Sequence, residues 1–145
     1  MRAVVQRVVE ASVSVGGEPV ATIAAGVVVL LGVATADTSA AAERLAGKVA
    51  RLRIFENVGG RFDRSLLDVR GAALVVSQFT LIADTTRGNR PSFAGAAEAG
   101  EAESLYERFC DALGANGVEV ARGMFGARMR LTLANDGPVT IVLDA

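Results

Sequence analysis

Hydrophobic and polar positions follow two different periods along the chain, and the first is that of a β-strand. Residues 2–15 are rich in β-branched side chains and alternate in polarity near their end, which predicts one long strand or a bent pair. The Gly-Gly pair at 16–17, followed by Pro19, predicts a hairpin turn. Residues 20–33 continue as strands, the second apolar enough to be buried on both faces.

Two other stretches have the period of an amphipathic helix. In residues 37–55 apolar side chains recur on one helical face, and the polar residues at 37–39 can cap the start. In residues 100–117 leucine and phenylalanine recur every four positions, and glycine can end the helix. We therefore expect two main helices, too far apart for a repeating βαβ pattern.

The remaining segments complete an α+β fold. Residues 56–71 read as an irregular hairpin, 72–83 as a strongly apolar strand, 84–93 as a polar loop and 118–145 as two or three more strands. The sequence predicts a mixed, largely antiparallel sheet or an open β-barrel with two main helices. No linker or repeat interrupts it, so we expect one domain over residues 1–145.

Composition narrows the class of protein. The chain is 51% hydrophobic, only 5% aromatic, and carries a net charge of −1 from 15 basic and 16 acidic residues. That balance argues against a protein that mainly coats nucleic acid, but it leaves contacts with a few phosphates open. The most apolar run is short for a membrane span and is broken by Gly26 and Gly32. The single cysteine, Cys110, fits a reducing compartment, and we expect a cytoplasmic protein without membrane contact.

The chain contains no histidine. This excludes nucleophilic systems that use a histidine base, and it removes histidine zinc sites. We expect neither a metal nor a cofactor. A hydrolase built from this sequence must use carboxylates, hydroxyls, backbone donors or groups of the substrate itself.

The first stretch with chemical interest is Ser77-Gln78-Phe79-Thr80-Leu81, at the end of the apolar strand 72–83. Two hydroxyls, an amide and an aromatic ring occur where the chain leaves the core, a position that suits a site because a rigid strand can aim side chains into a cleft. Composition alone favours a plainer interpretation, in which the hydroxyls satisfy local backbone and Phe79 belongs to the core.

The second stretch is Asn135-Asp136-Gly137-Pro138-Val139-Thr140, inside the last predicted strand. Proline cannot donate a hydrogen bond to a sheet, so Pro138 belongs at an edge, a strand start or a bulge. One interpretation is a tight turn before the final strand. The other is a Gly-Pro backbone held in place for a function, with its peptide bond cis.

Together these two stretches resemble the signatures SQFTL and NxGPVT of the D-aminoacyl-tRNA deacylase family. Further blocks such as LRIFE, GNRPSF, LYERF and GMFGARM follow in the family's order, so that the resemblance covers nearly the whole chain. Ser77 and Phe79 resemble the D-specific branch rather than its sister branch. Two positions depart from the family: Arg128 stands where an acidic residue is usual, and a proline ahead of the second helix is missing.

The resemblance implies an enzyme that cleaves the ester between a D-amino acid and the 3′-terminal ribose of tRNA. It implies a homodimer in which Gly137 and Pro138 of one subunit, joined by a cis peptide, enter the pocket around residues 77–81 of the other. A fixed backbone wedge would collide with L side chains and let D side chains pass, which is rejection by steric exclusion. Glycine has no side chain, so glycyl-tRNA mischarged on tRNA-Ala is an expected substrate.

The roles of individual residues follow from the same resemblance. The backbone N–H groups near Phe79 and Thr80 are expected to stabilise the oxyanion, with the ribose 2′-OH assisting the attack. Gln78 is expected to hold the adenosine or the carbonyl, with support from Ser77. Thr80 as a covalent nucleophile ranks second, because no base is evident.

Two points stay open at the level of sequence. Arg7 is a candidate to lock the Gly-Pro carbonyls. The arginines at 87, 90, 128 and 130 can contact tRNA phosphates or be ordinary surface charge. The alternative function is a dimeric β-module that binds RNA or protein without catalysis, although such a module needs neither signature.

Overall fold

One long strand organises the sheet, because three other strands pair with it. This strand is β1 (Arg2–Val15). The structure is a computed structural model, and it describes all residues 1–145. Along one edge, β3 (Gly26–Gly32) pairs with its first half and β2 (Glu18–Ile23) with its second half. Along the other edge, β8 (Arg130–Asp144) pairs with both halves, and all three pairings are antiparallel. The segment 2–15 is thus a single strand.

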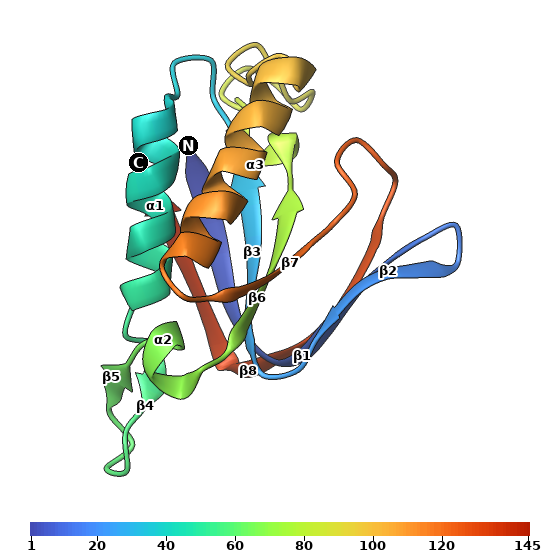
Figure 1. The fold of residues 1–145 in the computed structure, drawn as a ribbon. Coiled ribbons are helices and arrows are strands. Elements are labelled where there is room, and N and C mark those ends of the chain that lie inside the picture. The colour runs from blue at the N-terminus through green and yellow to red at the C-terminus, as the bar shows by residue number, and fades with distance from the viewer.

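The other end of the sheet is parallel. There β6 (Ala72–Ser77) pairs with β3, and β7 (Glu119–Arg122) pairs with β6. Parallel neighbours need long crossover connections, and the two main helices provide them. The strands bend strongly, so that the sheet curls into a partly open barrel (Figure 1). The predicted α+β class with a mixed, largely antiparallel sheet is confirmed.

The two predicted helices are α1 (Ser39–Arg51) and α3 (Ala99–Ala115), which lie side by side over one face of the sheet (Figure 1). Thr38 caps α1, since its hydroxyl accepts a hydrogen bond from the N–H of Ala41 at 3.2 Å. No helix is long and apolar enough to cross a membrane.

Two short helical segments were not expected from the sequence. They are α2 (Leu66–Val69), in the segment read as a hairpin, and the 3₁₀ turn η1 (Phe79–Ile82), in the segment read as a strand. One turn of helix has no hydrophobic period to reveal it. The predicted hairpin itself is present as β4 (Phe55–Glu56) and β5 (Phe62–Arg64).

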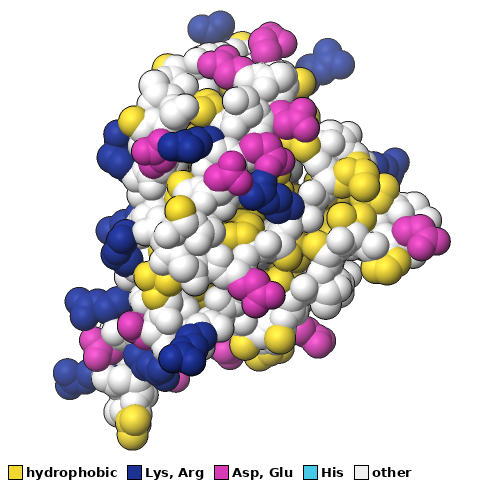
Figure 2. Space-filling model, viewed as in Figure 1, with side chains coloured by type: hydrophobic (Ala, Val, Ile, Leu, Met, Phe, Trp, Pro, Cys, Tyr) yellow, Lys and Arg dark blue, Asp and Glu magenta, His cyan; other side chains and the backbone are white.

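The core lies on both faces of the central strands. Val27, Val29 and Leu31 of β3 pack toward the helices, while Val28 between them belongs to a second apolar cluster on the opposite face. The strand is therefore buried on both faces, as predicted. Hydrophobic side chains show through the hollow between the helical side of the molecule and the β2–β8 side (Figure 2).

Candidate functional site

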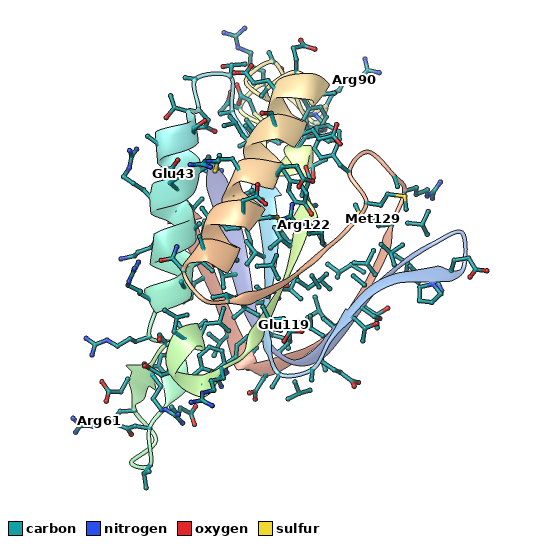
Figure 3. All side chains as sticks on the ribbon, in the orientation of Figure 1. Glu43, Arg61, Arg90, Glu119, Arg122 and Met129 are labelled. Carbon is teal, nitrogen blue, oxygen red and sulfur yellow. The ribbon has the colours of Figure 1, made fainter.

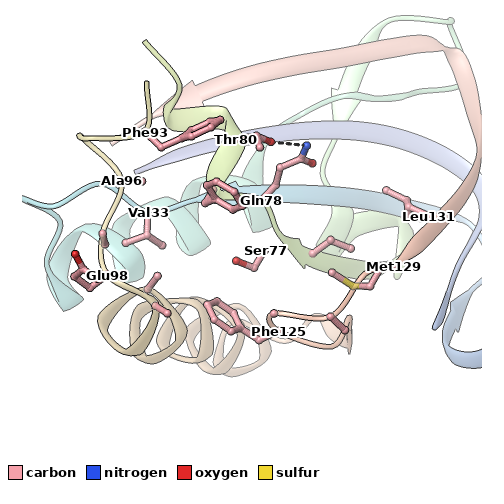
Figure 4. A pocket seen from close by; sticks show the side chains of 17 residues that line it. Val33, Ser77, Gln78, Thr80, Phe93, Ala96, Glu98, Phe125, Met129 and Leu131 are labelled. Carbon is pink, nitrogen blue, oxygen red and sulfur yellow. Dashed lines mark hydrogen bonds between the residues drawn. The ribbon is translucent and has the colours of Figure 1, made fainter. Parts of the chain in front are cut away.

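A pocket of about 630 Å³ opens at the carboxyl end of β6. Its lining is mainly apolar and comes from the end of β6 with η1, the residue after β3, the loop ahead of α3, the first turns of α3, the loop between β7 and β8, and the start of β8. The predicted residues Ser77, Gln78, Phe79 and Thr80 all line it (Figure 4). The structure thus brings together the whole first signature.

The chain turns sharply where β6 ends. The N–H of Gln78 makes a last sheet bond to the carbonyl oxygen of Leu31 at 2.8 Å, and η1 begins at the next residue. Gly32 permits this turn, because a Cβ there would lie 3.1 Å from the Gln78 carbonyl oxygen and 3.0 Å from Leu81 Cβ. The first N–H groups of such a turn have no partner within it, so those of Phe79 and Thr80 are available to a ligand.

Two polar side chains of the signature are linked. Gln78 Nε2 donates to Thr80 Oγ1 at 3.0 Å (Figure 4). The Thr80 hydroxyl therefore accepts from an amide, which is not a base, and Figure 4 shows Ser77 reaching into the pocket below this pair. The arrangement orients a polar rim over an otherwise apolar cavity.

Phe79 is not a core residue, which corrects the plainer interpretation of the sequence. Its side chain is 57% exposed, and its ring packs edge-on against Phe93 with centroids 5.0 Å apart. Phe93 and Phe125 line two walls of the pocket and were not singled out by the sequence. Both lie in stretches that resemble family blocks, GNRPSF and GMFGARM, which was the available signal.

A buried tyrosine supports the pocket from behind. The hydroxyl of Tyr106 on α3 donates to the carbonyl oxygen of Val75 on β6 at 2.8 Å, and its ring packs against Phe125. Burial raises the pKa of Tyr106 far above its usual range. Burial also raises the pKa of the neighbouring Cys110 thiol to about 12. These groups stay neutral and serve structure.

The second signature forms a bulge in β8. Val8 pairs with Asn135 and Gln6 pairs with Thr140, so that residues 136–139 bulge out of the ladder. Asn135 closes the bulge, since its Nδ2 donates to the carbonyl oxygens of Arg7 at 2.8 Å and Val139 at 3.0 Å. The Gly137–Pro138 peptide is cis and both residues are exposed, as an edge bulge allows.

Arg7 fixes this bulge, but through different atoms from those expected. Its side chain is nearly buried, and its Nε donates to the carbonyl oxygen of Asp136 at 3.2 Å, not to the carbonyls of Gly137 or Pro138. Its Nη1 donates to the carbonyl oxygen of Ile54 at 2.8 Å, and the guanidinium lies within 4 Å of the carboxylates of Glu56 and Asp136.

The two signatures lie far apart within one chain. The bulge is level with Arg7 and hence with Val27 and Ala73 across the sheet, whereas Ser77 lies four residues farther along β6. At a rise of about 3.3 Å per residue this is about 13 Å, and three strand spacings add about 14 Å sideways. Measured along the sheet, the bulge and the pocket of the same chain are therefore well separated.

Charge around the pocket is sparse. Glu98, at the start of α3, is the one ionisable residue in the lining. No three histidine, cysteine, aspartate or glutamate side chains converge to form a metal site. Apart from this one carboxylate, the chemistry available in the pocket is that of hydroxyl, amide and backbone N–H groups.

Comparisons with known proteins agree with the signatures. The family model described as D-Tyr-tRNA(Tyr) deacylase matches residues 4–144. A D-aminoacyl-tRNA deacylase of Chloroflexus aurantiacus is 57% identical over 145 residues, which is 100% of this chain and 91% of that protein. One from Thermus aquaticus is 54% identical over 100% of this chain and 95% of that protein.

Solved structures show the same architecture. A c-Myc DNA unwinding element binding protein superposes with a TM-score of 0.93 at 41% identity, covering 100% of this chain and 99% of that one. A probable eukaryotic D-amino acid tRNA deacylase superposes with a TM-score of 0.87 over 99% of this chain and 98% of that one. At 21% identity the second likeness bears on the fold alone.

Proposed function

Because the chain belongs to the D-Tyr-tRNA(Tyr) deacylase family, we propose that it is an enzyme that hydrolyses the ester of D-aminoacyl-tRNA, releasing the amino acid and free tRNA. The observation that carries the proposal is the pocket built on Ser77–Thr80, where a rigid strand ends in a 3₁₀ turn whose first N–H groups, those of Phe79 and Thr80, have no partner within the turn. Such donors stabilise the oxyanion that forms when an ester carbonyl is attacked.

The substrate completes the catalytic apparatus. The chain has no histidine, and the Thr80 hydroxyl is hydrogen-bonded to the Gln78 amide rather than to a base. The 2′-OH of the terminal ribose lies next to the ester and activates the attacking water, while the protein positions the carbonyl. Gln78 and Ser77 hold the nucleoside end, and a covalent intermediate on Thr80 ranks second.

Chirality is read by a second subunit. Gly137 and Pro138 are exposed, their bulge is held by Asn135 and Arg7, and it is well separated along the sheet from the pocket of the same chain. In a homodimer, this bulge enters the partner's pocket and blocks the direction in which an L side chain points. A D side chain points away from this bulge. Glycine has no side chain that could collide with it, so glycyl-tRNA mischarged on tRNA-Ala is also a substrate.

The decisive experiment compares D-tyrosyl-, L-tyrosyl- and glycyl-tRNA in one deacylation assay, with spontaneous hydrolysis subtracted. The expected result is rapid release of D-tyrosine and glycine and no enzymatic release of L-tyrosine. Equal rates on D-tyrosyl- and L-tyrosyl-tRNA would contradict the proposed rejection of L-amino acids. Inactivity on all three substrates would contradict the proposed deacylase activity.

The shared site has its own test. Light scattering should give twice the mass of the 14.9 kDa chain, and specific activity should fall on dilution in step with dissociation. A fully active monomer would refute the in-trans arrangement. We infer a cytoplasmic location, because the proposed substrate is charged tRNA.

A further inference from the structure

A second cleft, of about 650 Å³, adjoins the pocket on the side of the β1–β2 hairpin. We call it the basic cleft. It is lined by the residues around the hairpin turn and the start of β8, namely Ser14, Gly16, Gly17, Arg128, Met129, Arg130 and Leu131.

The basic cleft adjoins the pocket across a shared wall. Met129 and Leu131 line both, and Figure 3 shows Met129 on the chain that enters β8, above the β1–β2 hairpin. A ligand that binds in the pocket and is longer than the pocket can extend past Met129 and Leu131 into the basic cleft.

All charge in the basic cleft is positive and free of partners. Arg128 and Arg130 are exposed, form no ion pair, and face no acidic residue within the cleft lining. Nearby Arg122, by contrast, is paired with the carboxylates of Glu107 and Asp111. The cleft therefore keeps its positive charge for an external anion.

The opposite wall, at the turn of the β1–β2 hairpin, is open. Gly16 and Gly17 adopt positive φ values of 58° and 83°, and no atom lies within 4 Å of where a Cβ would stand on either. Arg130 is held across from Ser14 by the β1–β8 ladder. A bulky, flexible polyanion can lie against this wall without steric conflict.

We propose that the basic cleft binds backbone phosphates of the single-stranded 3′ end of tRNA, immediately before the nucleoside that occupies the pocket. The proposal rests on the proposed function, which places the esterified end of the RNA in the pocket. Guanidinium groups suit phosphate because they donate two parallel hydrogen bonds to its oxygens. Arg128 and Arg130 then add affinity for RNA without touching the reacting ester.

The test is the salt dependence of binding, with a fluorescently labelled, uncharged tRNA as the probe. Each contact with a single-stranded phosphate contributes about 0.7 to the slope of log affinity against log salt. For Arg128→Ala/Arg130→Ala we expect the slope to fall by about 1.4, so that the loss of affinity from about 50 to about 200 mM salt shrinks about sevenfold. Arg128→Lys/Arg130→Lys should restore the slope.

A control pair locates the effect. Arg44→Ala/Lys48→Ala removes two exposed cations from α1 and should keep the wild-type slope. An unchanged slope in the Arg128/Arg130 variant, or an equal fall of the slope in the control pair, overturns the proposal.

Hydrolysis of a D-aminoacyl-adenosine separates this inference from the function beneath it. That substrate has no phosphate, so the Arg128/Arg130 variant should cleave it at the wild-type rate while its KM for D-aminoacyl-tRNA rises. If the wild type hydrolyses neither substrate, the proposed deacylase function is refuted. If the Arg128/Arg130 variant loses the same factor of activity on both substrates, only the role of the basic cleft is refuted.

Discussion

Arg7 and Asp136 are 129 residues apart in the chain, yet Arg7 Nε donates to the Asp136 backbone carbonyl oxygen at 3.2 Å and lies 3.3 Å from its carboxylate. The first strand thereby holds the bulge of the last strand at its base. The Arg7 side chain is only 7% exposed, so this is an interior contact that reaches an exposed loop.

Arg7→Ala should lower the free energy of unfolding by about 2 kcal/mol, because it removes charged hydrogen bonds to two backbone carbonyls. It should also weaken the rejection of L-aminoacyl-tRNA, since the bulge loses its support. Urea unfolding and the tyrosyl-tRNA pair measure the two effects. Arg53→Ala, which breaks an exposed pair with Asp63, is the control and should change neither. Intact L-rejection in Arg7→Ala would show that Asn135 alone holds the bulge.

Gly137→Ala should be more damaging than an alanine at another glycine of positive φ. At Gly137 the φ is 128°, and a Cβ would lie 2.8 Å from Val139 Cγ2 and 3.2 Å from Arg7 Nη2. We expect a loss of about 2–3 kcal/mol and L-tyrosyl-tRNA hydrolysis. Gly60→Ala, at φ 79° with open space around it, isolates the backbone strain and should cost about 1 kcal/mol. Equal losses of stability in the two variants would mean that Val139 and Arg7 move away from the new Cβ at position 137.

Thr80→Ala should retain activity within about tenfold of wild type, since it removes one neutral hydrogen bond from Gln78. A substrate whose terminal ribose lacks the 2′-OH should lose about 100-fold or more in rate. Single-turnover rates on matched substrates test both. An acyl adduct on Thr80, detected by mass spectrometry, would reverse the ranking of the two mechanisms.

Cys110 should make the protein sensitive to alkali. Its thiol titrates near pH 8.5 when unfolded, but burial raises its folded pKa to about 12. Its contribution to stability is therefore complete below about pH 8.5 and is lost as the pH rises toward 12, by at most about 1.4 kcal/mol per pH unit.

The check is urea unfolding from about pH 8 to about pH 11, for wild type and Cys110→Ala. The wild-type free energy of unfolding should fall more steeply, while burial, the largest cause of the raised pKa of Tyr106, acts in both proteins. Parallel curves would mean that the thiol is not shielded. At neutral pH the thiol should react with a disulfide reagent only after unfolding, since it is 1% exposed.

Hydrophobic patterning predicted most of the elements and their type. The strand at 2–15, both long helices and the position of Ser77 at a strand end follow from local period and composition. The parallel pairing of β6 with β7 does not, because register between distant strands depends on how the helices pack across them. The 3₁₀ turn at Phe79 was missed since its apolar residues continue the strand pattern.

The site residues were predicted mainly from the two family signatures and less from the local hydrophobic pattern. The pocket walls at Phe93 and Phe125 come from loops whose paths the local pattern does not determine. Arg7, however, left a signal of its own. It follows Ala3 and Val5 in the alternation of β1, and a charged residue at a core-facing position needs partners that can satisfy it.

The pairing of β1 with β8 also bears on how the chain folds. These strands contain nearly the first and last residues, and they pair from Arg2 with Asp144 to Ser14 with Arg130. Contacts of such sequence separation require the longest loop closures, which slow folding. During synthesis, one edge of β1 stays without its partner until almost the whole chain has left the ribosome, so the nascent protein exposes an open strand edge for most of its production.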